Sequence, residues 1–261
     1  MSGGKESVDP RALSRLYLHA VLPCIADMAA QDEAARRAVA GWNLSLGFRI
    51  VGGPGATLRF AQGKVEHLPH RDVPATIELL FLGDRHLNAF FSGKNWALPL
   101  PVCAPWRIGT LIGFSKLADR MQAILLGDPV LLADPATRRL FTRMTLITAG
   151  LGLRPLAQFD AEAGALLHAA PPGLAAFTID GEENATVWFD SGTSAAGWST
   201  PPRVPDVVIR FADREVAYRA LRDEIDSLAS VGTGEIEVDG LVPLADSLNA
   251  VMERLRPYLE P

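Results

Sequence analysis

The chain of 261 residues is long enough for two domains of ordinary size, each with its own hydrophobic core. Its net charge of −5 and pI near 5.6 give no basic field that would neutralise phosphates, and no patch for anionic lipid is obvious, so nucleic acid is not expected as a partner. The polar start and the lack of a long apolar run predict neither a signal peptide nor an integral membrane segment, and we expect a cytoplasmic protein.

The first half is predicted to begin with an amphipathic helix. Asp9 is a suitable cap, Pro10 is favoured at the first helical position, and an apolar stripe follows as far as Cys24. Pro23 should kink or end this helix, because proline lacks the N–H group and clashes with the preceding turn. A second helix is predicted over about residues 32–40.

Four strands are predicted next, because the apolar period changes from helical spacing to alternation. The strands read FRIV, ATLRF, KVEHL and ATIELLF, and they lie between residues 48 and 81. GGPG at 52–55 is interpreted as a hairpin turn, since it does not open a helix as a phosphate-binding loop would. In the last strand, Ile77, Leu79 and Phe81 share one face, which is expected to contact a core.

A short helix and a closing helix complete the first half. Asp84 is suited to cap the short helix, and Gly93 is well placed to end it. A proline-rich apolar segment, NWALPLPVCAPW, then leads to a fifth strand predicted between Trp106 and Ile112. The closing helix is predicted over residues 113–125.

The second half repeats this order. Asp134 and Pro135 again form a cap and a helix start, and Pro155 is expected to open a further helix.

Two pairs of segments carry the repeat. Residues 177–192, FTIDGEENATVWFDSG, align without a gap with residues 48–63, FRIVGGPGATLRFAQG, with 7 identities in 16 positions. Residues 240–252, GLVPLADSLNAVM, align with residues 113–125, GFSKLADRMQAIL, with 5 identities in 13 positions. Chance gives about one identity in 16 positions, so the pattern indicates an internal duplication.

The repeated segments resemble the sterol carrier protein type 2 domain, the nonspecific lipid-transfer fold. The resemblance rests on ATLRFAQGKVEHLP and PATIELLFLGDRHLNAFFSGK in the first half, and on PDVVIRFADREV and GEIEVDGLVPLADSL in the second. It implies an α/β (α+β) fold of two tandem domains, residues 1–130 and 131–261, each a mostly antiparallel five-stranded sheet covered by helices. It also implies an apolar tunnel between sheet and helices that holds sterols, fatty acids or acyl-CoA. The segment NWALPLPVCAPW departs from the family pattern at a place that would reshape or close a tunnel mouth.

Candidate ligand-binding residues are the inward strand positions and the inner faces of the short and closing helices. In the first half they are Ile77, Leu79, Phe81, Phe90, Phe91, Leu117, Met121 and Leu125. In the second half they are Val207, Ile209, Phe211, Leu241, Leu244, Leu248 and Met252. Apolar stripes of this spacing more often form a plain core than a pocket, so the assignment depends on the resemblance.

No constellation for catalysis or metal binding is evident in the sequence. His67 and His70 are interpreted as surface residues at a strand end, because no cysteine or carboxylate cluster accompanies them. Cys24 and Cys103 are expected to be inert packing groups in a reducing compartment. GWST at 197–200 lacks the spacing of a hydrolase nucleophile. We therefore expect no enzyme activity, no cofactor and no metal.

The expected function is binding and intracellular carriage of an apolar ligand, namely a sterol, fatty acid, fatty acyl-CoA or isoprenoid lipid. The alternative is a non-catalytic accessory or scaffold protein that presents a lipid intermediate to partner enzymes of lipid metabolism. An enzyme that acts on a bound acyl group ranks lowest, because no nucleophile, base and orienting group occur together.

Overall fold

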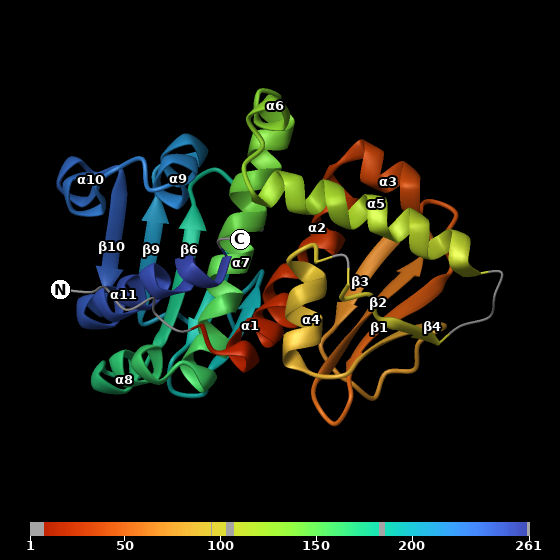
Figure 1. Ribbon diagram of the computed structural model, residues 1–261. Coiled ribbons are helices and arrows are strands. Elements are labelled where there is room, and N and C mark those ends of the chain that lie inside the picture. Colours follow the sequence, from red (N-terminus) through yellow and green to blue (C-terminus); the bar gives the residue numbers. More distant parts are fainter. Residues whose placement is uncertain (1–7, 95, 103–106, 183–185, 260–261) are drawn as a thin grey trace, which may run out of the picture. The chain divides into compact units, whose positions relative to one another are not determined.

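The computed structural model describes residues 8–94, 96–102, 107–182 and 186–259. Its contacts divide the chain into two compact units, each built around one five-stranded sheet (Figure 1). Ser14–Met144 form the first-sheet unit, and the second-sheet unit combines Thr145 and later residues with those up to Leu13. The domain boundary expected between residues 130 and 131 stays a prediction.

The first-sheet unit holds the strands that precede the middle of the chain. They are β1 (Leu44–Ile50), β2 (Gly55–Ala61), β3 (Lys64–Leu68), β4 (Ile77–Phe81) and β5 (Leu100–Val102). Its helices are the π-helix η1 (Tyr17–Val21), α2 (Cys24–Gln31), α3 (Glu33–Val39), α4 (Asp84–Phe91), α5 (Ile108–Leu125) and α6 (Pro129–Leu132). Helices α1 (Pro10–Leu16) and α7 (Pro135–Phe159) have residues in both units.

The second-sheet unit has the same strand order as the first. Its strands are β6 (Leu174–Ile179), β7 (Val187–Asp190), β8 (Ala195–Trp198), β9 (Val207–Phe211) and β10 (Ile236–Gly240). Its helices are α8 (Ala161–Ala169), α9 (Arg214–Leu221), α10 (Ser227–Thr233) and α11 (Val242–Leu259). The sheets run β3-β2-β1-β4-β5 and β8-β7-β6-β9-β10, with one parallel pair in each, β1 with β4 and β6 with β9. The predicted fold class, with two mostly antiparallel five-stranded sheets and helices, is confirmed.

The aligned segments occupy matching positions in the two sheets. Phe48 of β1 lies opposite Leu79 of β4, and Phe177 of β6 lies opposite Ile209 of β9. A shift of one residue would turn each apolar set to the other face, so the shared register keeps the same face of each sheet buried.

Aromatic rings fill the layer between the first sheet and its helices. Phe48 of β1 contacts Phe91 of α4 and Phe114 of α5, with ring centroids 6.1 and 5.7 Å apart. Phe90 lies 5.5 Å from Phe91 and 5.4 Å from Phe81 of β4. Because these rings lie at packing distance from one another, α4 and α5 are held on the same face of the sheet.

The fifth strand is not where the sequence analysis placed it. The expectation of a strand between Trp106 and Ile112 is wrong for the described residues of that stretch, because α5 begins at Ile108, and Trp106 lies outside the described residues. The strand β5 comes earlier, at Leu100–Val102, and pairs only with β4. An edge strand tolerates proline because one of its edges needs no hydrogen-bond donor.

Pro155 lies inside a helix and does not begin one, so that prediction is also wrong. Helix α7 runs unbroken from Pro135 to Phe159. Its neighbours Leu153 and Leu156 are fully buried. Their packing offsets a proline inside a helix, which typically costs about 3 kcal/mol.

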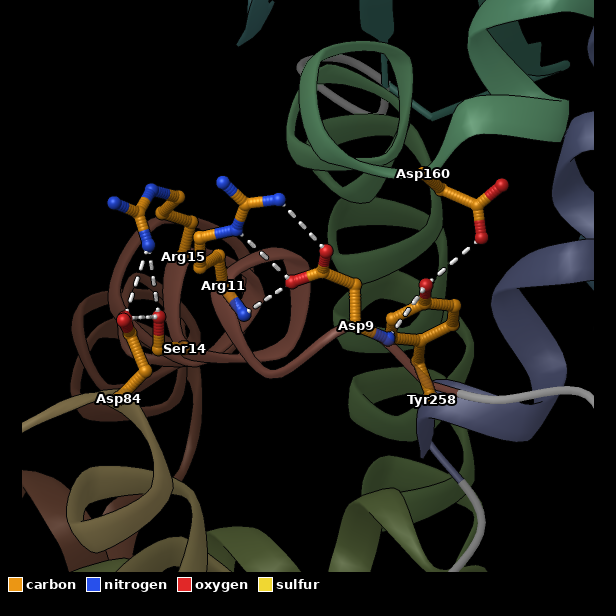
Figure 2. A network of polar contacts seen from close by, with 7 residues as sticks. All are labelled: Asp9, Arg11, Ser14, Arg15, Asp84, Asp160 and Tyr258. Carbon is orange, nitrogen blue, oxygen red and sulfur yellow. Dashed lines mark hydrogen bonds and ion pairs between the residues drawn. The ribbon is translucent and has the colours of Figure 1, made fainter.

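A polar network around Asp160 joins distant parts of the second-sheet unit, and Figure 2 shows the part that runs through Tyr258 to Asp9. The Asp160 carboxylate accepts hydrogen bonds from Nε of Arg254 at 3.2 Å and from the Tyr258 hydroxyl at 2.8 Å. It also accepts the Ala163 N–H at 2.9 Å and so caps α8. The N–H of Asp9 donates to the Tyr258 hydroxyl at 3.3 Å. One buried carboxylate therefore ties the start of α8, the end of α11 and the N-terminal segment together.

Candidate functional site

A groove of about 520 Å³ lies between α3 and α5 in the first-sheet unit. Its lining residues are Ala34, Ala35, Ala38, Trp42, Gly109, Thr110, Gly113, Lys116, Leu117 and Arg120. Most of these side chains are small, so the space between the helices comes from missing side-chain volume. Its volume lies within the range of about 300–1,000 Å³ that is usual for small-molecule sites.

Trp42 is the large apolar surface of the groove. Its ring packs edge-on against Phe60 of β2, with centroids 5.0 Å apart. A Cβ atom at Gly113 of α5 would lie 3.0 Å from the Trp42 ring, so this glycine lets α5 approach the indole closely. Since Phe60 is buried on the sheet, this contact anchors the indole that forms the apolar wall of the groove.

An ion pair between Asp32 and Arg120 joins the two helices that form the walls. Nε and Nη2 of Arg120 donate to the two Asp32 oxygens at 3.1 and 2.6 Å, and Asp32 also accepts the Ala35 N–H at 2.7 Å as the cap of α3. Burial raises the pKa of Asp32, but the hydrogen bonds from Arg120 and the backbone outweigh it, so the pKa is lowered overall. The same hydrogen bond raises the pKa of Arg120, so both partners are held in their charged forms. The pair stays charged near neutral pH and fixes the spacing of α3 and α5.

Lys116 adds a positive charge to the lining of the groove. Its side chain is exposed, and no ion pair of Lys116 is recorded within the described ranges. It lies one turn of α5 before Arg120. The groove thus combines an apolar surface with an ammonium group that is free to meet an anion.

The structure places the predicted ligand-binding residues mainly in the two hydrophobic cores. Buried members are Ile77, Leu79, Phe81, Leu117, Met121, Val207, Phe211, Leu244 and Leu248. Partly exposed members are Phe90, Phe91, Leu125, Ile209, Leu241 and Met252. Leu117 is the member that lines the groove. For the others, a role in lining a ligand stays a prediction.

The sequence interpretation missed most of the groove. Trp42, Lys116 and Arg120 have no role in binding among the expectations from the sequence. The one available signal is the run of small residues in AARRAVAGW before the first strand. Small residues carry no periodic apolar pattern, so they do not predict a groove by themselves.

His67 is not the surface residue that the sequence suggested. Its ring is mostly buried against η1, and its Nε2 lies 2.9 Å from the Leu18 carbonyl, to which it donates. His19 lies beside it, with ring centroids 6.3 Å apart. Burial lowers the pKa of His67 to about 4, against a smaller opposite effect of the Leu18 hydrogen bond. His70, three residues further, is exposed as expected.

The buried His67 predicts a loss of stability in mild acid. The unfolded chain takes up a proton near pH 6.5 and the folded chain near pH 4, so stability is full above pH 6.5 and falls as the pH drops toward 4. The loss from this group approaches about 3 kcal/mol. Urea unfolding at pH 7 and pH 5 should show a flatter pH dependence for His67→Gln than for the wild type. His70→Gln is the matched control, and an unchanged slope in His67→Gln would contradict the assignment.

Other chemistry is limited in the described part of the chain. Within it, no group of three or more His, Cys, Asp and Glu side chains is placed to hold a metal ion. Cys24 is buried, in line with a packing role, while Cys103 lies outside the described residues. Among the described helices, none is long and apolar enough to span a bilayer.

Comparisons with known proteins give similarity to solved structures. No family model and no curated protein matches the chain. The sterol carrier protein domain 2 of Helicoverpa armigera is 16% identical, with a TM-score of 0.33, over 42% of this chain and 87% of that one. Sterol Carrier Protein 2 Like 2 from Aedes aegypti is 18% identical, with a TM-score of 0.30, over 42% of this chain and 97% of that one. Each similarity covers less than half of this chain, so two tandem domains of that family stay a prediction.

Proposed function

We propose that this protein binds and carries an apolar or amphipathic lipid, and that the groove between α3 and α5 admits the ligand. The observation that carries the proposal is a space of about 520 Å³ lined by alanines, glycines and Trp42. Filling it with hydrocarbon removes apolar surface from water, worth about 0.8 kcal/mol for each buried methylene. The sequence resemblance to sterol carrier domains supports the same class of ligand.

The positive charge of Lys116 in the groove favours a fatty acid over a neutral sterol. Lys116 lines the groove with an exposed ammonium group, and Arg120 is already engaged by Asp32. A carboxylate beside Lys116 gains a charge-assisted hydrogen bond without disturbing the Asp32 pair.

Titration of the full chain with cis-parinaric acid, a fluorescent fatty acid, tests the proposal. Ala38 is exposed and lines the groove, so Ala38→Trp fills it without touching the core. We expect its affinity for the fatty acid to fall by at least about tenfold, because most of the apolar contact is lost. Ala136→Trp is the control, since Ala136 is exposed on a helix and does not line the groove.

Two further results locate the ligand. Lys116→Glu should weaken binding of cis-parinaric acid much more than binding of the neutral dehydroergosterol. If Leu248→Trp, which alters the core under α11, lowers uptake while Ala38→Trp does not, the ligand lies in the interior of the second-sheet unit and the groove assignment is wrong. Absence of binding by the wild type would overturn the proposed function itself.

A further inference from the structure

The outer face of β4 and β5 carries a row of exposed apolar side chains. In the β4–β5 pairing, Leu80 lies opposite Leu100 and Glu78 lies opposite Val102. Residues opposite each other project to the same face of a sheet. Since Leu79 of β4 is buried on the inner face, Leu100 and Val102 face outward, and both are more than half exposed.

The row continues beyond the two strands. Leu82 and Leu98 are each 71% exposed, and Trp96 is 74% exposed. His86 links the backbone at Leu82 to the backbone at Leu98, because its Nδ1 accepts the Leu82 N–H at 3.1 Å and its Nε2 donates to the Leu98 carbonyl at 3.1 Å. The members of this apolar edge patch are Leu82, Trp96, Leu98, Leu100 and Val102. Exposed apolar side chains gathered in this way usually mark an interaction surface.

The second-sheet unit has charged residues at the matching positions. Glu237 of β10 lies opposite Arg210 of β9, and Asp239 lies opposite Val208, where the first sheet has Leu100 and Val102. Arg210 and Glu237 form an ion pair with 2.9 Å between Nη1 and Oε2. The topology therefore accepts a polar edge, and the apolar residues on β5 are not required by the fold.

Three basic residues accompany the patch in sequence. Arg85, Lys94 and Arg107 lie between residues 82 and 107, where the only acidic residue is Asp84. The segment thus has a charge of 3 − 1 = +2 in a chain of net charge −5. Asp84 is paired with Arg15, while no ion pair of the three cations is recorded among the described residues. Glu78, which lies on the outer face opposite Val102, is paired with Arg49 at 3.7 Å, so the charge of the segment remains positive and complementary to an anionic surface.

We propose that the apolar edge patch adsorbs the protein to membranes that contain anionic lipids. Leucine and tryptophan side chains enter the interface between headgroups and acyl chains, and nearby cations attract the lipid phosphates and carboxylates. Pro101 in the centre of β5 lacks the N–H needed for pairing with another strand, so the patch does not serve to extend the sheet with a second copy of the chain. The patch shares no residue with the groove, so this inference does not depend on the ligand.

Flotation of the full chain with vesicles tests the inference. The vesicles are phosphatidylcholine alone or with about 30% phosphatidylserine, a content chosen to give a negative surface potential. The wild type should float with the anionic vesicles, and less so when the salt concentration is raised. The double variant Leu98→Glu/Leu100→Glu should reduce the bound fraction by about tenfold or more, since the inserted surface becomes charged.

Matched variants separate the patch from general effects. Val130→Glu changes an even more exposed apolar residue on α6 and should leave flotation unchanged. Arg85→Gln/Lys94→Gln should weaken binding to anionic vesicles and should reduce its dependence on salt. The inference is overturned if the wild type does not float, or if Leu98→Glu/Leu100→Glu floats as well as the wild type. It is also overturned if sedimentation shows a dimer that Leu98→Glu/Leu100→Glu dissociates and that does not bind vesicles.

Discussion

Replacing Asp160 with alanine is expected to lower the free energy of unfolding of the second-sheet unit by about 3–5 kcal/mol, because a buried ion pair loses its anion. Only 6% of the Asp160 side chain and 17% of the Arg254 side chain are exposed. The carboxylate also accepts the Tyr258 hydroxyl and caps α8. Burial and the nearby carboxylate raise the pKa of Tyr258 to about 12, so the hydroxyl remains a donor at neutral pH.

Two milder substitutions divide this loss into its parts. Asp160→Asn keeps one oxygen that can still cap α8, but it removes the charge and places an NH2 donor where the Tyr258 hydroxyl needs an acceptor, so we expect a loss of about 1–3 kcal/mol. Glu162→Gln removes a second carboxylate that contacts Arg254, but Glu162 is 73% exposed, and the expected loss is under about 1 kcal/mol. Urea unfolding gives the size of each loss. Hydrogen exchange should show that Asp160→Ala opens α8, the end of α11 and the segment around Asp9 together, and equal protection in all three variants would contradict this.

The alternation and the repeats predicted most of the two sheets. Phe48 and Phe177, which the alignment superimposes, lie at the same register in β1 and β6. Such positions are predictable because a buried sheet face demands an apolar residue at every second place. Asp134, predicted to cap a helix, does so at the start of α7, where it accepts the Thr137 N–H at 2.9 Å. The same prediction for Asp84 is wrong, because Gly83 is the cap residue of α4 and the Asp84 carboxylate instead accepts hydrogen bonds from Ser14 and Arg15.

Three features were not predictable because tertiary contacts decide them. The prolines around Leu100 concealed β5, whose pairing with β4 is a long-range contact. Pro155 remains inside α7 because buried leucines on both sides hold the helix in place. The groove arises where alanines of α3 meet glycines of α5, two segments far apart in the chain. Its existence depends on how the helices are spaced, which the ion pair between Asp32 and Arg120 sets.

The alignment also equated two glycines that the structure uses differently. Gly240 ends β10 with a φ of +104°, and a Cβ atom there would lie 2.2 Å from the carbonyl oxygen of Asp206. Gly113 lies within α5, and a Cβ atom there would meet only the Trp42 ring, at 3.0 Å. Identity at these positions therefore reflects descent or chance, and only Gly240 is required by the backbone.

Gly240→Ala should destabilise the second-sheet unit by at least about 3 kcal/mol, because the strained φ and the backbone clash act together. The clash involves Asp206, whose backbone hydrogen bonds connect the residue after β10 with the start of β6. The Asp206 carbonyl accepts the Leu241 N–H at 2.9 Å, and the Asp206 N–H donates to Leu174 of β6 at 2.7 Å. Backbone cannot move aside as a flexible side chain can, so β10 must separate from the end of β9 at this point.

Gly113→Ala is the matched control for Gly240→Ala, and its effect should stay within about 1 kcal/mol, because the gain in helix propensity opposes the crowding of Trp42. Urea unfolding of the two variants, with hydrogen exchange to locate the loss, compares the aligned positions directly. Loss of protection in β9 and β10 of Gly240→Ala alone is the expected pattern. Equal losses in both variants would contradict the different roles of the two glycines, one at the end of a strand and the other inside α5.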